Sequence, residues 1–247
     1  MKKKILILGA SSDMGLALIK RLNNPNYFIG AHCFKGKKRI LKFLKNNKII
    51  SKIKIFTKDL SRQENCWKLV DEYVKWSKGV DCMIQLNGNV SKVIKWDKLK
   101  NTNWKKDIDI NLGSPFFASQ RVFKYMKNNG GKIIFMSTAS AKHGGGKTTL
   151  AYGVSKAGVE ALTKALAREG AQHNILVNAI APGLIDTRFH KEKLGRSLSD
   201  LRKRKKLAKL KRMGKPDEIA AIIENVISEN VNFMTGEVIS VSGGDWL

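Results

Sequence analysis

The 247-residue chain contains only three cysteines and four histidines, and it has no long apolar run. Cys33, Cys66 and Cys82 are scattered, which excludes a disulfide framework and favours a reducing compartment, so we expect a cytoplasmic protein. Neither the cysteines nor the histidines have ligand spacing, and no metal site is expected. No segment reaches the roughly 18 apolar residues of a membrane span, so no membrane association is expected.

Acidic residues are also scarce, with 20 Asp and Glu against 47 Lys and Arg, a formal net charge of +27. The chain is rich in Lys, Asn and Ile throughout, so a compositional bias of the genome explains the charge without any function. Alternatively, the charge attracts acidic partners such as phosphorylated cofactors, coenzyme A thioesters, acyl carrier protein or nucleic acid. Nucleic acid is the least favoured of these, because the charge is spread along the chain without a recognised binding motif.

Short apolar segments alternate regularly with amphipathic ones. This alternation predicts one doubly wound α/β domain over residues 1–247, with a mostly seven-stranded parallel sheet covered by helices on both faces. Strands are expected at 4–8, 27–33, 52–56, 81–86, 131–136, 175–181 and 237–241, and helices at 14–23, 37–46, 62–77, 103–127, 152–170 and 216–228. An insert at about 188–213 stands apart, because Leu194, Leu198 and Leu201 recur there at helical spacing and eight cations follow between Arg202 and Arg212.

Tyr152 and Lys156 are four residues apart in a segment with helical periodicity. Residues at this spacing share one helix face, so the phenol and the ammonium are expected side by side. A nearby cation favours the phenolate and would lower the pKa of Tyr152 from about 10, which suits proton transfer near neutral pH.

Two further segments have the features of an α/β active site. Residues 4–8 form an apolar strand that enters a Gly/Ser turn at residues 9–15, the arrangement that places a nucleotide diphosphate at a helix N-terminus. The strand expected at 131–136 ends in a hydroxyl cluster shortly before Tyr152, made of Ser137, Thr138 and Ser140.

Taken in order, these landmarks resemble the short-chain dehydrogenase/reductase family over essentially the whole chain, and most closely its 3-oxoacyl-(acyl carrier protein) reductase branch. Eight matches in register make the resemblance highly specific. They are the glycine turn at 9–15, Asp59-Leu60, Leu86-Asn87-Gly88, Asn111, the strand-end hydroxyls, Tyr152 with Lys156, Pro182-Gly183, and Thr235-Gly236 with Ser242-Gly243-Gly244.

The resemblance implies an NAD(P)-dependent oxidoreductase in which Tyr152 gives a proton to the substrate carbonyl and Thr138 holds the carbonyl oxygen. Lys156 would lower the pKa of Tyr152 and bind the nicotinamide ribose, and Asn111 would support Lys156 through a water relay. The insert at 188–213 would be the substrate lid. The cofactor-binding residues implied are Gly9, Ser11, Ser12, Met14, Gly15, Lys35, Asp59, Leu60, Leu86, Asn87, Gly88, Tyr152, Lys156, Pro182, Gly183, Ile185 and Thr187.

The resemblance also implies a homotetramer. Its contacts would involve paired long helices around 103–127 and 152–170, and the C-terminal residues 245–247.

The chain departs from the family pattern at three positions. Asp13 replaces the middle glycine of the turn; it is expected to cap the following helix, the alternative being a lost cofactor site. Leu86 replaces an asparagine, so any contact there must come from its backbone. Thr138 falls where a serine is usual, with Ser140 as the alternative hydroxyl and Ser137 expected to point to the other side of the strand.

The end of the second strand decides the cofactor. An NAD enzyme would carry an acidic side chain there, and none is present, whereas Lys35, Lys37, Lys38 and Arg39 follow. This favours NADP over NAD, although the cations are also what a solvated helix start would have. The arginine that the family usually has in the glycine turn is absent, and Ser12 stands in its place.

The sequence therefore favours a reductase or dehydrogenase that uses NADP(H) on a carbonyl/hydroxyl pair, with a 3-oxoacyl thioester among the candidate substrates. A sugar or other cell-surface precursor is the alternative substrate. A catalytically weak cofactor-binding protein and a nucleic-acid-binding protein on the same fold are the alternative functions. The substrate would be a small molecule or a thioester, and the charge favours an acidic one.

Overall fold

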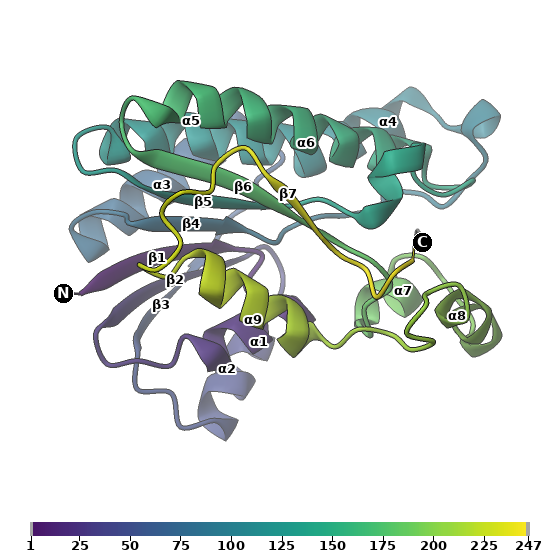
Figure 1. Cartoon of the computed structure of the whole chain (residues 1–247), viewed down its shortest axis with the longest axis horizontal. Helices are drawn as coiled ribbons and strands as arrows, with labels where there is room; N and C mark the ends of the chain where they lie inside the picture. The colour runs from purple at the N-terminus through teal and green to yellow at the C-terminus, as the bar shows by residue number, and fades with distance from the viewer. Residues whose placement is uncertain (1, 246–247) are drawn as a thin grey trace.

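A computed structural model describes residues 2–245. Seven parallel strands form one sheet in the order β3-β2-β1-β4-β5-β6-β7 (Figure 1). The strands are β1 (Lys3–Leu8), β2 (Tyr27–Cys33), β3 (Lys52–Thr57), β4 (Cys82–Gln85), β5 (Gly131–Met136), β6 (Ile175–Pro182) and β7 (Val238–Val241). The predicted doubly wound fold is confirmed.

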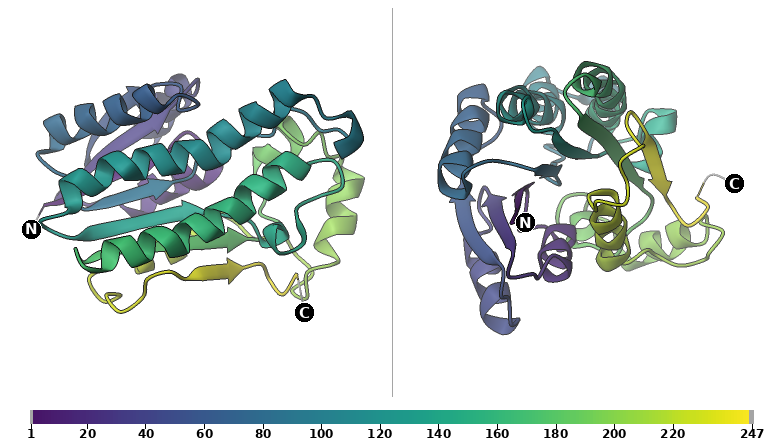
Figure 2. Two further views of the ribbon diagram at one scale, coloured as in Figure 1. Left: turned by 90° about the horizontal axis from the view of Figure 1, so that it is seen from above. Right: turned by 60° about the vertical axis from the view of Figure 1, so that its left-hand side comes forward.

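Helices cover both faces of the sheet, so the central strands are apolar on both sides (Figure 2). One face packs against α1 (Asp13–Arg21), α2 (Lys37–Asn46) and α9 (Pro216–Val226), and the other against α3 (Gln63–Ser77), α5 (Ser114–Met126) and α6 (Leu150–Ala171). In β1 this produces a strand whose four residues from Ile5 to Leu8 are all fully buried.

The strand order reverses between β1 and β4, because β2 and β3 extend to one side of β1 and the later strands to the other. Such a switch point opens a crevice at the carboxyl ends of the strands, where α/β proteins bind their ligands. The helices α7 (Arg188–Glu192) and α8 (Leu198–Lys205) lie at this end of the molecule (Figure 1).

The helix expected over 103–127 is interrupted. It consists of α4 (Asn101–Ile108), a π-helical turn at Asp109–Gly113, and α5. Single π turns widen a helix by one residue and occur frequently at functional sites. Periodicity alone did not predict the turn, because the flanking helices continue without a change of sequence pattern.

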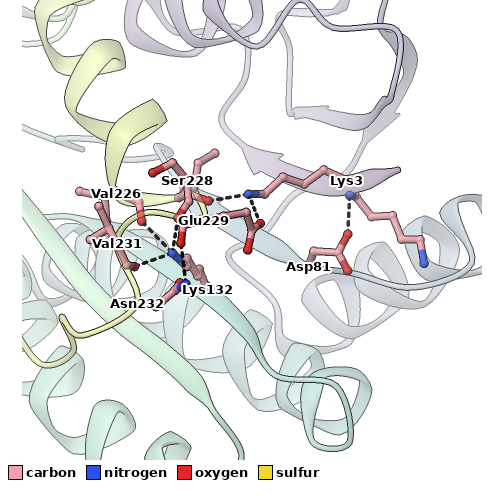
Figure 3. Close-up of polar contacts among 10 residues, drawn as sticks. Lys3, Asp81, Lys132, Val226, Ser228, Glu229, Val231 and Asn232 are labelled. Carbon is pink, nitrogen blue, oxygen red and sulfur yellow. Dashed lines mark hydrogen bonds and ion pairs between the residues drawn. The ribbon is translucent and has the colours of Figure 1, made fainter. Parts of the chain in front are cut away.

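The amino ends of the strands are fastened by two lysines (Figure 3). Lys132 of β5 donates hydrogen bonds from Nζ to the backbone oxygens of Ser228 and Val231, both at 2.6 Å, and of Val226 at 3.3 Å. Lys3 of β1 donates to the backbone oxygen of Ile227 at 2.6 Å. Both ammonium groups thus satisfy carbonyls at the C-terminal end of α9 and in the segment that follows it.

Among residues 2–245 no helix is long and apolar enough to cross a membrane. Of the C-terminal residues expected in tetramer contacts, Asp245 is described, whereas residues 246 and 247 lie outside the described part of the chain.

Candidate active site

Tyr152 and Lys156 lie one turn apart on α6, as the sequence predicts. The Lys156 Nζ atom is 5.7 Å from the centroid of the Tyr152 ring. Its ammonium donates a hydrogen bond to the backbone oxygen of Met136, at the end of β5, at 2.7 Å. Lys156 is only 2% exposed, whereas Tyr152 is partly exposed. The pair is therefore anchored to the carboxyl end of the sheet through its lysine.

The expected lowering of the Tyr152 pKa is wrong for this arrangement. Burial raises the pKa of Tyr152 above its usual value. Burial also lowers the pKa of Lys156 to about 8. Desolvation penalises the charged form of each group, and the ammonium is directed to the Met136 carbonyl rather than to the phenol. At neutral pH the tyrosine therefore holds its proton.

The hydroxyls after β5 divide into two groups. Thr138 and Ser140 lie together, with their Oγ1 and Oγ atoms 3.2 Å apart, and Thr138 caps the short 3-10 helix Ala139–His143. Ser137 instead donates to the Glu160 carboxylate of α6 at 2.6 Å. Ser137 is thus directed differently from Thr138, as expected. Thr138 and Ser140, the two candidate catalytic hydroxyls, lie side by side.

Asn111 lies in the π turn and is fully buried. Its Oδ1 accepts a hydrogen bond from the backbone N–H of Asn89 at 2.9 Å. Its Nδ2 donates to the backbone oxygens of Asn89 and Asp107, both at 2.8 Å. A Cβ atom at Gly88 would lie 3.1 Å from Asn111 Oδ1 and 3.7 Å from Lys156 Nζ. Gly88, Asn111 and Lys156 are therefore neighbours, although their contact is not a direct hydrogen bond.

The glycine turn joins β1 to α1 beside β4. Gly9 adopts a φ of +82°, and a Cβ atom there would lie 2.5 Å from the backbone nitrogen of Asn87. Only glycine allows this close approach of the two strand ends. Gly15 is similarly close-packed, because its Cβ would lie 2.6 Å from the Ala10 oxygen.

Asp13 is not the N-cap of α1, which corrects the expectation. Ser12 is the N-cap, and its Oγ accepts a hydrogen bond from the Gly15 amide at 3.0 Å. Asp13 is the first residue of the helix, and its carboxylate is turned to Arg39 and Arg188. A serine is as good a cap as an aspartate, so capping preference alone does not distinguish Asp13 from the adjacent Ser12.

His32 supports the glycine turn, a role that the sequence did not reveal. Its Nδ1 accepts from the Gly9 amide at 3.3 Å, and its Nε2 lies 3.0 Å from the backbone oxygen of Lys58. Burial lowers the pKa of His32 to about 4, so the ring is neutral at pH 7, with the Nε2 proton directed to Lys58. The only available signal was a histidine within an otherwise apolar strand.

The end of β2 lies against the same turn. A Cβ atom at Gly36 would lie 2.3 Å from the Cβ and Oγ atoms of Ser11. Arg39, in the first turn of α2, donates to the Ser11 backbone oxygen and pairs with the Asp13 carboxylate. Lys35 is directed over the Phe34 ring, 5.3 Å from its centroid. Of the two cations Lys35 and Arg39, which follow β2, it is therefore Arg39 that contacts the glycine turn.

The remaining residues expected to bind a cofactor follow the carboxyl ends of β1, β3, β4 and β6. Most of them are buried or half-buried, and those at the strand ends are held by backbone contacts, such as the hydrogen bond from the Gly183 amide to the Val241 oxygen at 3.0 Å. Asp59 is bound locally, because its Oδ1 accepts from the Ser61 amide at 3.0 Å. The residues at or after these strand ends are Met14, Asp59, Leu60, Leu86, Asn87, Gly88, Pro182, Gly183, Ile185 and Thr187.

The basic segment, residues 188–213, borders this crevice from its first helix. Phe189 of α7 packs against Tyr152, with ring centroids 5.8 Å apart. The segment is tied to the C-terminal end of the chain by a hydrogen bond from the Leu210 amide to the Gly243 oxygen at 3.1 Å. Of its eight cations from residue 202 on, only Arg204 and Arg212 have a carboxylate within ion-pair distance among the described residues.

A doubly wound sheet with a glycine turn at its switch point and a Tyr–Lys pair beside it defines an oxidoreductase of the Rossmann type. Residues 9–245 match the family described as Enoyl-(Acyl carrier protein) reductase. The chain is 35% identical to the 3-oxoacyl-[acyl-carrier-protein] reductase FabG of Buchnera aphidicola subsp. Baizongia pistaciae, over 100% of this chain and 98% of that protein.

It is also 29% identical to the acetoacetyl-CoA reductase of Acinetobacter sp. over 98% of this chain and 97% of that one. A solved short-chain dehydrogenase/reductase from Serratia marcescens has the same fold, with a TM-score of 0.90 at 23% identity over 99% of this chain and 98% of that one. The chain therefore belongs to the short-chain dehydrogenase/reductase family and is an oxidoreductase.

Proposed function

We propose that the protein reduces the 3-oxo group of a 3-oxoacyl thioester with NADPH. The observation that carries the proposal is the Tyr152–Lys156 pair, which is anchored at the carboxyl end of β5. The names of the two relatives identify one as a reductase of acyl-carrier-protein thioesters and the other as a reductase of a coenzyme A thioester. No feature of residues 2–245 favours a sugar precursor or nucleic acid over a thioester.

The chain is suited to a dinucleotide. The turn between Gly9 and Gly15 presents the N-terminus of α1 at the switch point of the sheet, where free N–H groups and the helix dipole favour a diphosphate. Asp13, the one carboxylate in the turn, is paired with two arginines and so is not an unopposed charge. Ser11, Ser12 and the strand-end residues around the crevice would hold the rest of the cofactor.

A bound NADPH would supply the hydride that the substrate carbon accepts. Tyr152 supplies the proton to the carbonyl oxygen, and its raised pKa keeps that proton on the phenol until it is needed. The alkoxide that forms is the conjugate base of an aliphatic alcohol, a weaker acid than a phenol, so the transfer is favourable. Thr138, with Ser140 beside it, orients the oxygen, and Lys156 opposes the negative charge that then develops on Tyr152.

Asn111 has a positioning role in this proposal. Its fully engaged amide holds the π turn against the Asn89 backbone, and Gly88 leaves room for Lys156 beside it. A larger residue at Gly88 would displace either Asn111 Oδ1 or Lys156 Nζ.

NADP is favoured over NAD because the end of β2 presents cations and no carboxylate to the ribose. Arg39 lies on the Ser11 backbone and Lys35 is nearby, a setting for the 2′-phosphate.

The basic segment 188–213 serves as the substrate lid in this proposal. Of its eight cations from residue 202 on, six lack a carboxylate partner among the described residues, which favours an acidic substrate. The proposed assembly is a homotetramer, since Phe116 of α5 and Val154 of α6 are each 40% exposed on the helices expected to pair. The proposed compartment is the cytoplasm, where three buried free cysteines are stable.

The test is an assay of cofactor oxidation with acetoacetyl-CoA, with NADPH and NADH compared at equal concentration. We expect turnover with NADPH, and Tyr152→Phe should abolish most of it. Tyr27→Phe, which removes a phenol from β2 far from the crevice, is the matched control and should leave the rate unchanged. No turnover of any carbonyl substrate by the folded protein, or a preference for NADH, would contradict the proposal.

A further inference from the structure

Asp13 joins three segments that are far apart in sequence. Its Oδ2 accepts a hydrogen bond from the Arg188 amide at 2.8 Å, and its Oδ1 lies 3.5 Å from Arg188 Nε. The same Oδ1 accepts a hydrogen bond from the Arg39 guanidinium. The glycine turn, the start of α2 and the start of α7 therefore meet at one carboxylate whose side chain is only 19% exposed.

The carboxylate is ionised in this setting. Burial alone would raise the pKa of Asp13, but the Arg188 amide and the Arg39 guanidinium outweigh burial and hold the pKa below its usual value. A negative charge in the first turn of α1 is also favoured by the helix dipole.

Arg39 occupies a place that the glycine turn itself leaves without a cation. The turn carries Ser12 where the resembled family usually has arginine, and Arg39 reaches the turn from α2 by donating to the Ser11 oxygen. Asp13 fixes the other end of the same guanidinium. The arginine is thereby ordered before any phosphate arrives, which reduces the entropy lost on binding.

Arg188 links Asp13 to the segment that contacts Tyr152. It is the first residue of α7, and the next residue, Phe189, packs against the Tyr152 ring. The start of the lid is therefore held between Asp13 on the cofactor side and Tyr152 on the substrate side.

We propose that Asp13 is a positioning residue that fastens the lid to the cofactor-binding turn, and that it orients Arg39 for the 2′-phosphate while it holds α7 against Tyr152. The inference rests on the proposed use of NADP. It predicts that one side chain affects both the choice of cofactor and the order of the lid, through different arginines.

Three variants separate the contact of Asp13 with Arg39 from its contact with Arg188. Asp13→Asn removes both ion pairs, and Arg39→Met removes only the contact on the cofactor side. Arg188→Met removes the side-chain contact on the lid side together with the 3.2 Å ion pair of Arg188 to Glu192 within α7. Asp217→Asn is the matched control, since it breaks an ion pair of 3.2 Å to Arg21 at the far end of α1. All four are compared with the wild type by fluorescence titration with NADPH and NADH, and by hydrogen–deuterium exchange of residues 186–194.

Asp13→Asn should lower the ratio of NADPH to NADH affinity about tenfold or more, the effect of losing about one hydrogen bond to a charged group, and should speed exchange in α7 by a similar factor. Arg39→Met should change the affinity ratio alone, Arg188→Met the exchange alone, and Asp217→Asn neither. Suppose that Asp13→Asn instead increased the affinity for NADPH and NADH equally and left hydrogen–deuterium exchange of α7 unchanged. The only effect of the carboxylate would then be to repel the diphosphate, and the inference would be overturned.

A change in only one readout for Asp13→Asn would also overturn it. If Asp13→Asn failed to fold, as judged by circular dichroism, the two arginine variants would still decide, because an unchanged ratio for Arg39→Met or unchanged exchange for Arg188→Met contradicts the inference. A wild type that prefers NADH would instead overturn the proposed cofactor, and the exchange comparison would still test the attachment of the lid.

Discussion

Replacing Lys132 by methionine should destabilise the protein more than replacing any exposed lysine. Lys132 is 8% exposed, and its ammonium satisfies three carbonyl oxygens at the end of α9 (Figure 3). Methionine has nearly the same length and fills the same space, so the change removes the charge and the three hydrogen bonds with little loss of packing.

The magnitude follows from what remains after the substitution. The hydrogen bond to Val226 is buried, so its carbonyl would be left without a partner, at a cost of about 1–3 kcal/mol. The carbonyls of Ser228 and Val231 are partly accessible and can bind water, so their loss adds only about 1 kcal/mol. Burial lowers the pKa of Lys132, which shows that the ammonium itself is penalised and offsets part of the loss. The net expectation is about 2–3 kcal/mol.

Urea unfolding at one fixed protein concentration measures this, because self-association would make stability depend on concentration. Lys4→Met is the matched control: Lys4 neighbours Lys3 in β1, and its ammonium donates a single exposed hydrogen bond to the Lys78 oxygen at 2.9 Å. It should cost less than about 1 kcal/mol. An equal decrease in the free energy of unfolding of the two variants would refute the reasoning. It would mean that a buried carbonyl without a hydrogen-bond donor costs no more than an exposed one.

Three further predictions concern the proposed site. Tyr152→Phe should lower kcat by about 10²–10⁴ while NADPH binding, followed by fluorescence, stays the same; a variant with normal turnover would remove Tyr152 from the chemistry. Burial lowers the pKa of Lys156 from 10.5 to about 8, so between pH 8 and 10.5 the unfolded chain holds a proton that the folded protein has released. The free energy of unfolding should therefore rise with pH in this range by up to about 1.4 kcal/mol per pH unit relative to Lys156→Met. Parallel plots of unfolding free energy against pH for the two proteins would show that Lys156 has an ordinary pKa. Reversing Lys203, Lys205 and Lys209 to glutamate should lower kcat/KM for acetoacetyl-CoA and its dependence on salt, but spare a small neutral ketone; equal effects on both substrates would leave the charge of the lid without a role.

The sheet and its switch point could be predicted from sequence because each depends on local pattern. Residues 4–8 are apolar without interruption, which indicates a strand buried on both faces, and the glycine turn follows at once. The spacing of Tyr152 and Lys156 likewise places them on one helix face, because helical geometry alone decides it.

The features that the sequence did not predict depend on where side chains from distant segments end. The pKa of Tyr152 rises because its phenol is buried. The ammonium of Lys156 bonds to the backbone oxygen of Met136, on a strand. The π turn around Asn111 forms where the Asn89 backbone bonds to the Asn111 amide, a contact between segments 22 residues apart. Neither partner is marked by spacing or composition.

Asp13 illustrates the same limit and explains why one departure from a family pattern does not by itself indicate loss of function. A carboxylate beside a diphosphate is unfavourable when it is considered alone, and the sequence offers only helix capping as compensation. The structure provides another compensation, because Arg39 and Arg188 converge on that carboxylate from 26 and 175 residues away. Arg188 also pairs with Glu192 at 3.2 Å, so the two arginines and the two carboxylates cancel, and Asp13 adds no net negative charge at the turn. The departure therefore alters how the turn is connected to α2 and α7, and it leaves the attraction of the turn for a diphosphate in place.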